Sequence, residues 1–195
     1  MRHEVEITGT SPLLQHRFAE AEEARKSTRA VHVGREDPRE EAERHAYRVV
    51  EGMSPAPAGT LYFPGAALAR LLREGGGSHK QRGSRKSIKY VIPSAVLVED
   101  DVVPLSLEGQ FLSEIEVDSR PVVIPATKGR IMRHRARVNS WGATFSLSID
   151  DTLVDEDLVH QILVEGGSRI GLGDFRPEKG GPFGRFRVTG WKAIK

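Results

Sequence analysis

The sequence predicts an α+β protein with a ferredoxin-like core, in which strands and helices follow the order βαββαβ. Two observations carry this prediction. Short segments of alternating apolar and polar residues, typical of half-buried strands, flank two segments with helical spacing of apolar residues. Glycine and proline clusters separate these segments. The expected product is a four-stranded antiparallel sheet with helices on one face, which leaves the other face open to a ligand.

The first and last strands of the core are predicted from alternation near the two ends of the chain. Residues 3–10 place Val5 and Ile7 between polar residues, and residues 183–192 alternate Phe186 and Val188 with arginines. Further strands are predicted over residues 60–63, 91–98, 102–107, 114–125, 129–138 and 143–149. The last of these has the most regular alternation in the chain, whereas Pro93 disturbs the register of the second.

Two helices are predicted for the core. The segment 66–74 has apolar residues at helical spacing and stops at three glycines, 75–77. The second helix begins in the acidic segment 150–157, whose carboxylates suit a helix N-terminus, and ends at Gly166 and Gly167. Residues 15–55 are predicted to be a partly helical and partly irregular insertion, with a helix from Pro38, inside one domain spanning 1–195.

The composition excludes several kinds of chemistry. The chain has 195 residues and no cysteine, so disulfides, zinc–thiolate sites and cysteine nucleophiles are absent. No apolar run has the roughly 20 residues that a membrane helix needs, and the charged N-terminus is unlike a signal peptide. We therefore expect a cytoplasmic protein without membrane contact. The acidic segment 150–157 lacks the spacing of a calcium loop, and no metal or cofactor is predicted.

A glycine- and arginine-rich segment, residues 166–188, carries the strongest binding signal. Seven of its 23 residues are glycine. Glycines such as Gly171 and Gly173 allow close backbone approach to an anion, and arginines donate forked hydrogen bonds to phosphate. Phe175 and Phe183 could stack on bases. The cations that we expect to contact phosphate here are Arg169, Arg176, Lys179 and Arg185. The alternative is a glycine-rich hairpin with solvated arginines.

Two further basic segments are candidates for the same ligand. In the polar loop 78–89 the candidates are Lys80, Arg82, Arg85, Lys86 and Lys89. In the strand 129–138 they are Arg133, Arg135 and Arg137, which recur with period two and so share one face, expected to be exposed. A solvated loop and a solvated strand face are the respective alternatives.

Four segments in order resemble the RAMP superfamily, the repeat-associated RNA-binding proteins of CRISPR systems. They are VEITGTSPL at 5–13, YFPGAALARLLR at 62–73, WGATFSL at 141–147, and the glycine-rich segment. The similarity is closest to the backbone subunit that polymerises along CRISPR RNA. It implies an RRM-like variant of the ferredoxin-like fold. Ala66, Ala67 and Ala69 stand where the family has serines and a glycine, so a phage-encoded relative is also plausible.

The resemblance implies a non-catalytic protein that holds single-stranded, guide-like RNA by backbone contacts and assembles head to tail or with other effector subunits. Arg17, after the first strand, joins the expected contacts. Processing ribonucleases of the superfamily place a histidine near His16, so a metal-independent endoribonuclease is one alternative. Asp37 is either an acid that cleaves target RNA or a helix cap. The sequence also leaves open a structural or interaction protein, and a single-stranded DNA-binding protein of phage origin.

Overall fold

The computed structural model describes residues 1–17, 37–81, 83–123 and 128–194 and confirms the predicted fold class. The core elements are β1 (Arg2–Gly9), α3 (Gly65–Gly75), β4 (Val96–Val98) with β5 (Val102–Leu107), β9 (Gly142–Ile149), α5 (Glu156–Arg169) and β10 (Phe186–Ile194). The strand order β10-β1-β9-β5-β3 is that of a ferredoxin-like sheet, extended by β3 (Tyr62–Pro64). Its pairs are antiparallel, β4 pairs with β9, and β6 (Gln110–Phe111) pairs with β5.

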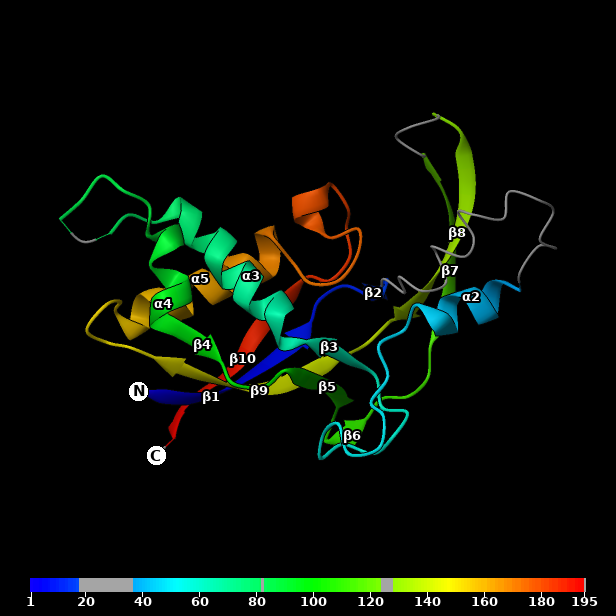
Figure 1. Cartoon of the computed structure of the whole chain (residues 1–195), viewed down its shortest axis with the longest axis horizontal. Coiled ribbons are helices and arrows are strands. Elements are labelled where there is room, and N and C mark those ends of the chain that lie inside the picture. The colour runs from blue at the N-terminus through cyan, green and yellow to red at the C-terminus, as the bar shows by residue number, and fades with distance from the viewer. Residues whose placement is uncertain (18–36, 82, 124–127, 195) are drawn as a thin grey trace.

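The core lies between this sheet and the two long helices, which cover the same face (Figure 1). Alternation in β1 and β9 turns Val5, Ile7, Phe145 and Leu147 toward the helices, where all four are buried. Each such side chain contributes about 1.5–3 kcal/mol by leaving water. Trp141 is 1% exposed. Its indole N–H donates to the Ser11 carbonyl at 2.9 Å, which joins the start of β9 to the turn after β1.

The glycines of α5 pack against neighbours rather than end the helix. The helix runs through Gly166 and Gly167 to Arg169, so the predicted stop at these glycines is wrong. A Cβ at Gly166 would lie 2.5 Å from Cδ2 of Leu71 in α3, and one at Gly167 would lie 2.5 Å from the Phe186 carbonyl oxygen in β10. These glycines therefore bring α5 into close contact with the helix and strand beside it.

The predicted strand 91–98 is largely helical. A 3-10 turn (Ile88–Tyr90) and the short helix α4 (Ile92–Ala95) precede β4. Pro93 occupies the first turn of α4, where its missing N–H costs nothing. The acidic segment before α5 also differs, because Asp155 makes no capping hydrogen bond with its side chain. Instead the Asp150 carboxylate accepts hydrogen bonds from the Thr152 N–H and hydroxyl.

A second sheet lies beside the core, with the order β2-β8-β7. The strands β7 (Glu116–Val123) and β8 (Arg130–Val138) match the strands predicted over 114–125 and 129–138, and the two pair antiparallel. The strand β2 (Leu13–Gln15) pairs with β8. The hairpin of β7 and β8 projects from the core, and α2 (Pro38–Arg44) packs against it (Figure 1). Residues 18–36 of the segment 15–55 lie outside the described residues, and its assignment as an insertion stays a prediction.

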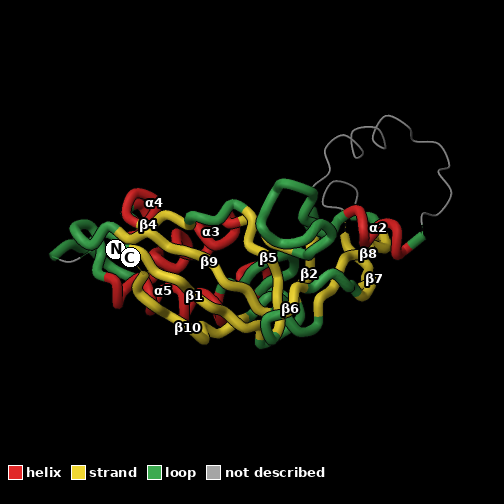
Figure 2. Tube along the Cα trace, turned by 90° about the horizontal axis from the view of Figure 1, so that it is seen from below, coloured by secondary structure: helices red, strands yellow, loops and turns green. Residues whose placement is uncertain are grey.

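Seen from below, the strands of the core sheet run side by side beneath the helices, and the hairpin sheet lies at one end (Figure 2). None of the helices in the described part of the chain is long and apolar enough to cross a membrane.

Candidate nucleic-acid interface

A groove of about 230 Å³ opens between β2, the start of α3 and the glycine-rich loop. Gln15 holds its β2 side in place: its side-chain amide donates to the Tyr62 carbonyl, and its carbonyl oxygen accepts from the Tyr47 N–H, both at 2.8 Å. The residues that line the groove are Leu13, Gln15, His16, Tyr47, Phe63, Pro64, Ala67, Arg70, Leu172, Gly173, Asp174 and Arg176. Three of the four segments that resemble the RAMP superfamily therefore meet at one place.

Several backbone N–H groups of the glycine-rich loop form hydrogen bonds within the protein. Gly171, Gly173 and Gly184 have positive φ angles of 73°, 71° and 69°, which glycine adopts without a steric cost. The N–H groups of Leu172, Asp174 and Gly184 donate to carbonyls of Gly184, Leu14 and Pro12. These N–H groups are thus unavailable as an anion nest. The loop residues that line the groove are Leu172, Gly173, Asp174 and Arg176. Binding by Gly171 and Gly173 stays a prediction.

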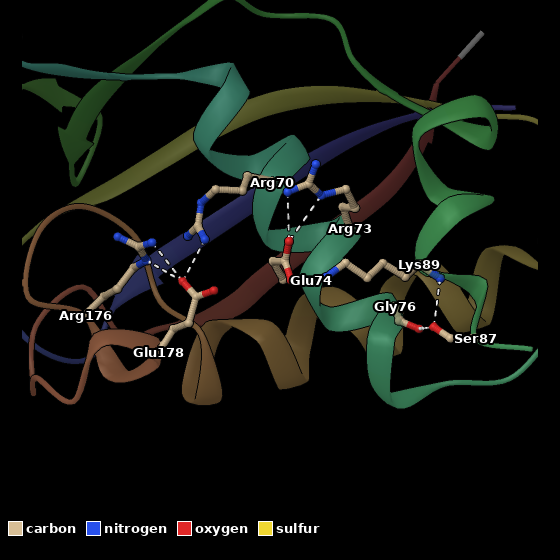
Figure 3. A network of polar contacts seen from close by, with 8 residues as sticks. All are labelled: Arg70, Arg73, Glu74, Gly76, Ser87, Lys89, Arg176 and Glu178. Atoms are coloured by element: carbon tan, nitrogen blue, oxygen red, sulfur yellow. Dashed lines mark hydrogen bonds and ion pairs between the residues drawn. The ribbon is translucent and has the colours of Figure 1, made fainter.

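Two arginines meet on one carboxylate at the rim of the groove (Figure 3). Oε2 of Glu178 accepts from Nη1 of Arg70 at 2.7 Å and from Nη2 of Arg176 at 2.8 Å. Arg176 also donates to the Gly173 carbonyl at 3.0 Å. Partial burial by itself would raise the pKa of Glu178, but the two guanidinium groups outweigh it and lower that pKa. This network fixes two cations, with a net charge of +1, beside the groove.

His16 is half-buried directly after β2. Burial, and next the proximity of His45, lower its pKa, while the Asp174 carboxylate opposes them. The two imidazole rings meet edge to face, with centroids 4.7 Å apart. Nδ1 of His45 lies 2.8 Å from the Arg17 carbonyl oxygen. His16 is therefore uncharged near neutral pH, whereas the Arg17 side chain is exposed beside it.

The arginine stripe of β8 is only partly exposed. Arg135 is 9% exposed and forms an ion pair with Asp174 of the glycine-rich loop. Arg133 lies 3.8 Å from Glu41 of α2, and Arg137 is half-buried. The expectation of an exposed face is wrong for Arg135, because the loop and α2 pack over this part of the hairpin. An RNA contact by Arg135 requires its ion pair to open; contacts by Arg133 and Arg137 stay predictions.

A residue that the sequence did not single out joins the hairpin to the loop. The guanidinium of Arg120 in β7 lies 4.7 Å from the ring centre of Phe183 and 5.3 Å from that of Phe175. Asp118 binds the same guanidinium through both carboxylate oxygens, at 2.5 and 2.6 Å. The two phenylalanines that could stack on bases thus lie beside an arginine, and their stacking on bases stays a prediction. In the sequence, Arg120 is one of several polar residues in an alternating strand. No sequence pattern therefore indicates that it joins the hairpin to the glycine-rich loop.

The other cations of the glycine-rich segment differ in whether they form ion pairs or hydrogen bonds within the protein. Arg169 pairs with Glu165 one helical turn earlier, at 2.9 Å, and Nη1 of Arg185 donates to the Ser168 carbonyl at 2.9 Å. Lys179 is exposed and has no ion-pair partner among the residues that the structure covers. Lys179 and Arg17 are therefore exposed cations, close in sequence to the groove-lining residues Arg176 and His16.

The basic loop 78–89 lies away from this groove, at the end of the molecule opposite the hairpin (Figure 1). Lys89 pairs with Glu74 at 2.6 Å, and Arg73 binds the same carboxylate (Figure 3). Lys80, Arg85 and Lys86 are exposed without ion pairs to described residues, and Arg82 lies outside the described residues. A contact of this loop with RNA stays a prediction, and it would involve a separate surface.

Asp37 caps helix α2 in the structure. Its carboxylate accepts hydrogen bonds from the N–H groups of Arg39 at 2.8 Å and Glu40 at 3.3 Å. This geometry matches the helix-cap alternative. A cleaving role for Asp37 stays a prediction. Within the described ranges, no group of three or more metal-ligating side chains comes together.

Comparison with known proteins adds one finding on the fold. No family model matches the chain, and no curated protein matches it. Among solved structures, it is similar to a chain of the type III-B Cmr-beta bound to cognate target RNA, with a TM-score of 0.51 and 10% sequence identity. The match covers 100% of this chain and 60% of that chain. The similarity shows a shared fold, and this chain spans about three fifths of the length of its neighbour.

Proposed function

We propose that the protein binds single-stranded, guide-like RNA in the groove beside the glycine-rich loop, through contacts to the RNA backbone and without cutting it. The observation that carries this proposal is the pair of guanidinium groups, Arg70 and Arg176, fixed at the rim of the groove. Exposed Arg17 and Lys179, close in sequence to the groove-lining His16 and Arg176, add positive charge. The RAMP-like segments around the groove, and the fold shared with a chain of an RNA-bound Cmr-beta structure, support the same ligand.

The groove is a better RNA site than the open face of the sheet. That face carries Glu4 and Glu6 from β1 and Thr144, Ser146 and Ser148 from β9. The alternation of β1, β9 and β10 puts no aromatic side chain on it, whereas RRM-type sheets bind RNA by stacking bases on aromatic rings. We therefore place the RNA along the side of the molecule that holds the hairpin and the glycine-rich loop, where head-to-tail neighbours would continue its path.

Replacing Arg17 and Lys179 together by alanine tests this proposal. We expect weaker binding of single-stranded RNA and a shallower salt dependence. The slope of log K against log salt should fall by about 0.7 for each lost phosphate contact. Filter binding at several salt concentrations measures both quantities. Lys192→Ala, on the open face of the sheet, is the matched control and should bind as the parent does. Unchanged affinity and slope in the double variant would sink the proposal.

An endoribonuclease is the second candidate, because the neutral imidazole of His16 could accept a proton from a ribose 2′-hydroxyl. Labelled RNA, incubated in chelator with the parent chain and with His16→Ala, separates the two functions. Cleavage that is lost in the variant would favour the enzyme. Intact RNA with both chains favours a binding protein. Competition with single-stranded DNA of the same sequence tests whether DNA is the ligand instead.

A further inference from the structure

We propose that the groove accepts one nucleobase turned out of the bound RNA, and that the Asp174 carboxylate accepts a hydrogen bond from the amino group of that base. This inference rests on the proposed function, since it assigns a base-reading role to one part of the same RNA site. It predicts a preference for adenine, cytosine or guanine over uracil, because uracil lacks an exocyclic amino group.

The size and lining of the groove fit a single heterocycle. Its volume of about 230 Å³ is below the roughly 300–1,000 Å³ of pockets for drug-sized ligands. Tyr47, Pro64 and Ala67 are half-buried and give the groove its accessible apolar surface. Leu13 and Leu172, both 0% exposed, lie behind that surface. An apolar floor favours a flat ring over a hydrated phosphate. The phosphate of the same nucleotide would stay at the rim, near Arg70 and Arg176.

The position of Asp174 suits an acceptor of hydrogen bonds. Its N–H donates to the Leu14 carbonyl at 2.8 Å, which anchors the residue against β2. Oδ2 is paired with Arg135, and Oδ1 has no partner within the described part of the chain. A carboxylate oxygen can only accept, and it repels phosphate. Oδ1 therefore selects for a ligand with an N–H group, and the backbone hydrogen bond to Leu14 keeps the residue in place.

Two aromatic side chains complete the walls of the groove. His16 is uncharged, so it presents a ring to a base rather than a cation to a phosphate. Tyr47 packs edge to face against Tyr62 at 5.5 Å, and its hydroxyl makes no hydrogen bond to the described residues. Burial raises the pKa of Tyr47, so the hydroxyl keeps its proton. Both rings can pack against a base of either size.

The experiment compares RNA oligonucleotides of one length by fluorescence anisotropy with the full chain. We expect oligo(A) and oligo(C) to bind about tenfold tighter than oligo(U), the effect of one hydrogen bond to a charged acceptor. Oligo(A) in which purine riboside replaces adenosine lacks the amino group and should lose this advantage. That arm alters only the ligand, so it does not depend on the folding of any variant.

Protein variants then assign the preference to Asp174. Asp174→Ala is combined with Arg135→Met, so that no buried cation is left without a partner, and this pair should bind all oligonucleotides equally. Arg135→Met alone keeps the acceptor and should keep the preference. Equal affinity of the parent chain for oligo(A), oligo(C), oligo(U) and the purine riboside oligonucleotide would overturn the base-reading role while leaving RNA binding intact. Absence of binding to every oligonucleotide would overturn the proposed function as well.

Discussion

At the scale of single residues, His16 in the groove couples the stability of the fold to pH. Burial is the largest cause of the lowered pKa of this imidazole. Its pKa also responds to the nearby side chains of His45, Asp174, Arg135 and Arg133. A histidine with a lowered pKa in the folded state binds its proton more readily once the chain unfolds. At neutral pH the imidazole is neutral in both states, so its burial costs no protonation free energy. In acid the unfolded chain takes up the proton first, and this lowers the free energy of unfolding.

We expect the free energy of unfolding to fall as pH decreases below about 6.5, the ordinary pKa of histidine. His16→Asn should reduce the slope of stability against pH in this window, because its amide does not titrate. Urea titrations at several pH values between 5 and 8 measure this slope. His160→Asn, on α5, controls for histidine replacement in general. The same slope in His16→Asn and the parent would show that His16 does not couple stability to pH.

At the scale of elements, α5 shows that one sequence pattern can suit two structures. Glycine often ends a helix, and the pair Gly166 and Gly167 indicates such an end in the sequence. In the fold they lie inside α5, where Leu71 and the Phe186 carbonyl leave no room for a side chain. The close approach positions the start of the glycine-rich loop relative to α3 and β10.

Gly167→Ala should therefore destabilise the protein by about 1–3 kcal/mol, because its Cβ would collide with backbone rather than with a flexible side chain. Gly77→Ala is the matched control, since the nearest atom to a Cβ there is Cδ of Lys89 at 4.0 Å. Denaturant unfolding of both variants gives the comparison. Equal midpoints for the two alanine variants would contradict the packing role of Gly167.

At the scale of the whole molecule, the hairpin and the glycine-rich loop form one unit through Arg120 and Arg135. Arg120 is bound by Asp118 and faces both phenylalanine rings, while Arg135 pairs with Asp174. Phe175 adopts a φ of 46°, a conformation that bulky residues rarely take, so the surrounding contacts must hold it there. Side chains of the hairpin and of the glycine-rich loop thus set the orientation of the hairpin relative to the core.

Arg120→Ala should let the hairpin move relative to the core. The chain contains no cysteine, so two can be introduced for spin labels, at Met132 on the hairpin and at Leu97 on the core sheet, both exposed. Pulsed electron paramagnetic resonance should give a broader distance distribution in the Arg120→Ala variant. Arg130→Ala, at an exposed cation of the same hairpin, is the control and should leave the distance distribution narrow. Identical distributions in all three chains would rule out this role of Arg120.

Much of the fold could be predicted from local patterns. The alternation around Val5, Ile7, Phe145 and Leu147 reports which side of a strand is buried, and that depends on neighbours two residues away. The helix at 66–74 is predictable for the same reason. The segment 91–98 is not, because its apolar residues suit a strand and a short helix equally, and Pro93 at the first turn of α4 decides between them.

By itself, the sequence determined the ferredoxin-like core and the presence of a glycine- and arginine-rich segment, since both follow from residues close together in the chain. Only the tertiary structure decided how that segment is arranged and which residues it contacts. It assigned the loop N–H groups to partners such as Leu14 and Pro12, joined Arg176 to Arg70 through Glu178, and brought Arg120 and Arg135 onto the loop. These contacts join residues far apart in the sequence, and local periodicity carries no information about such pairs.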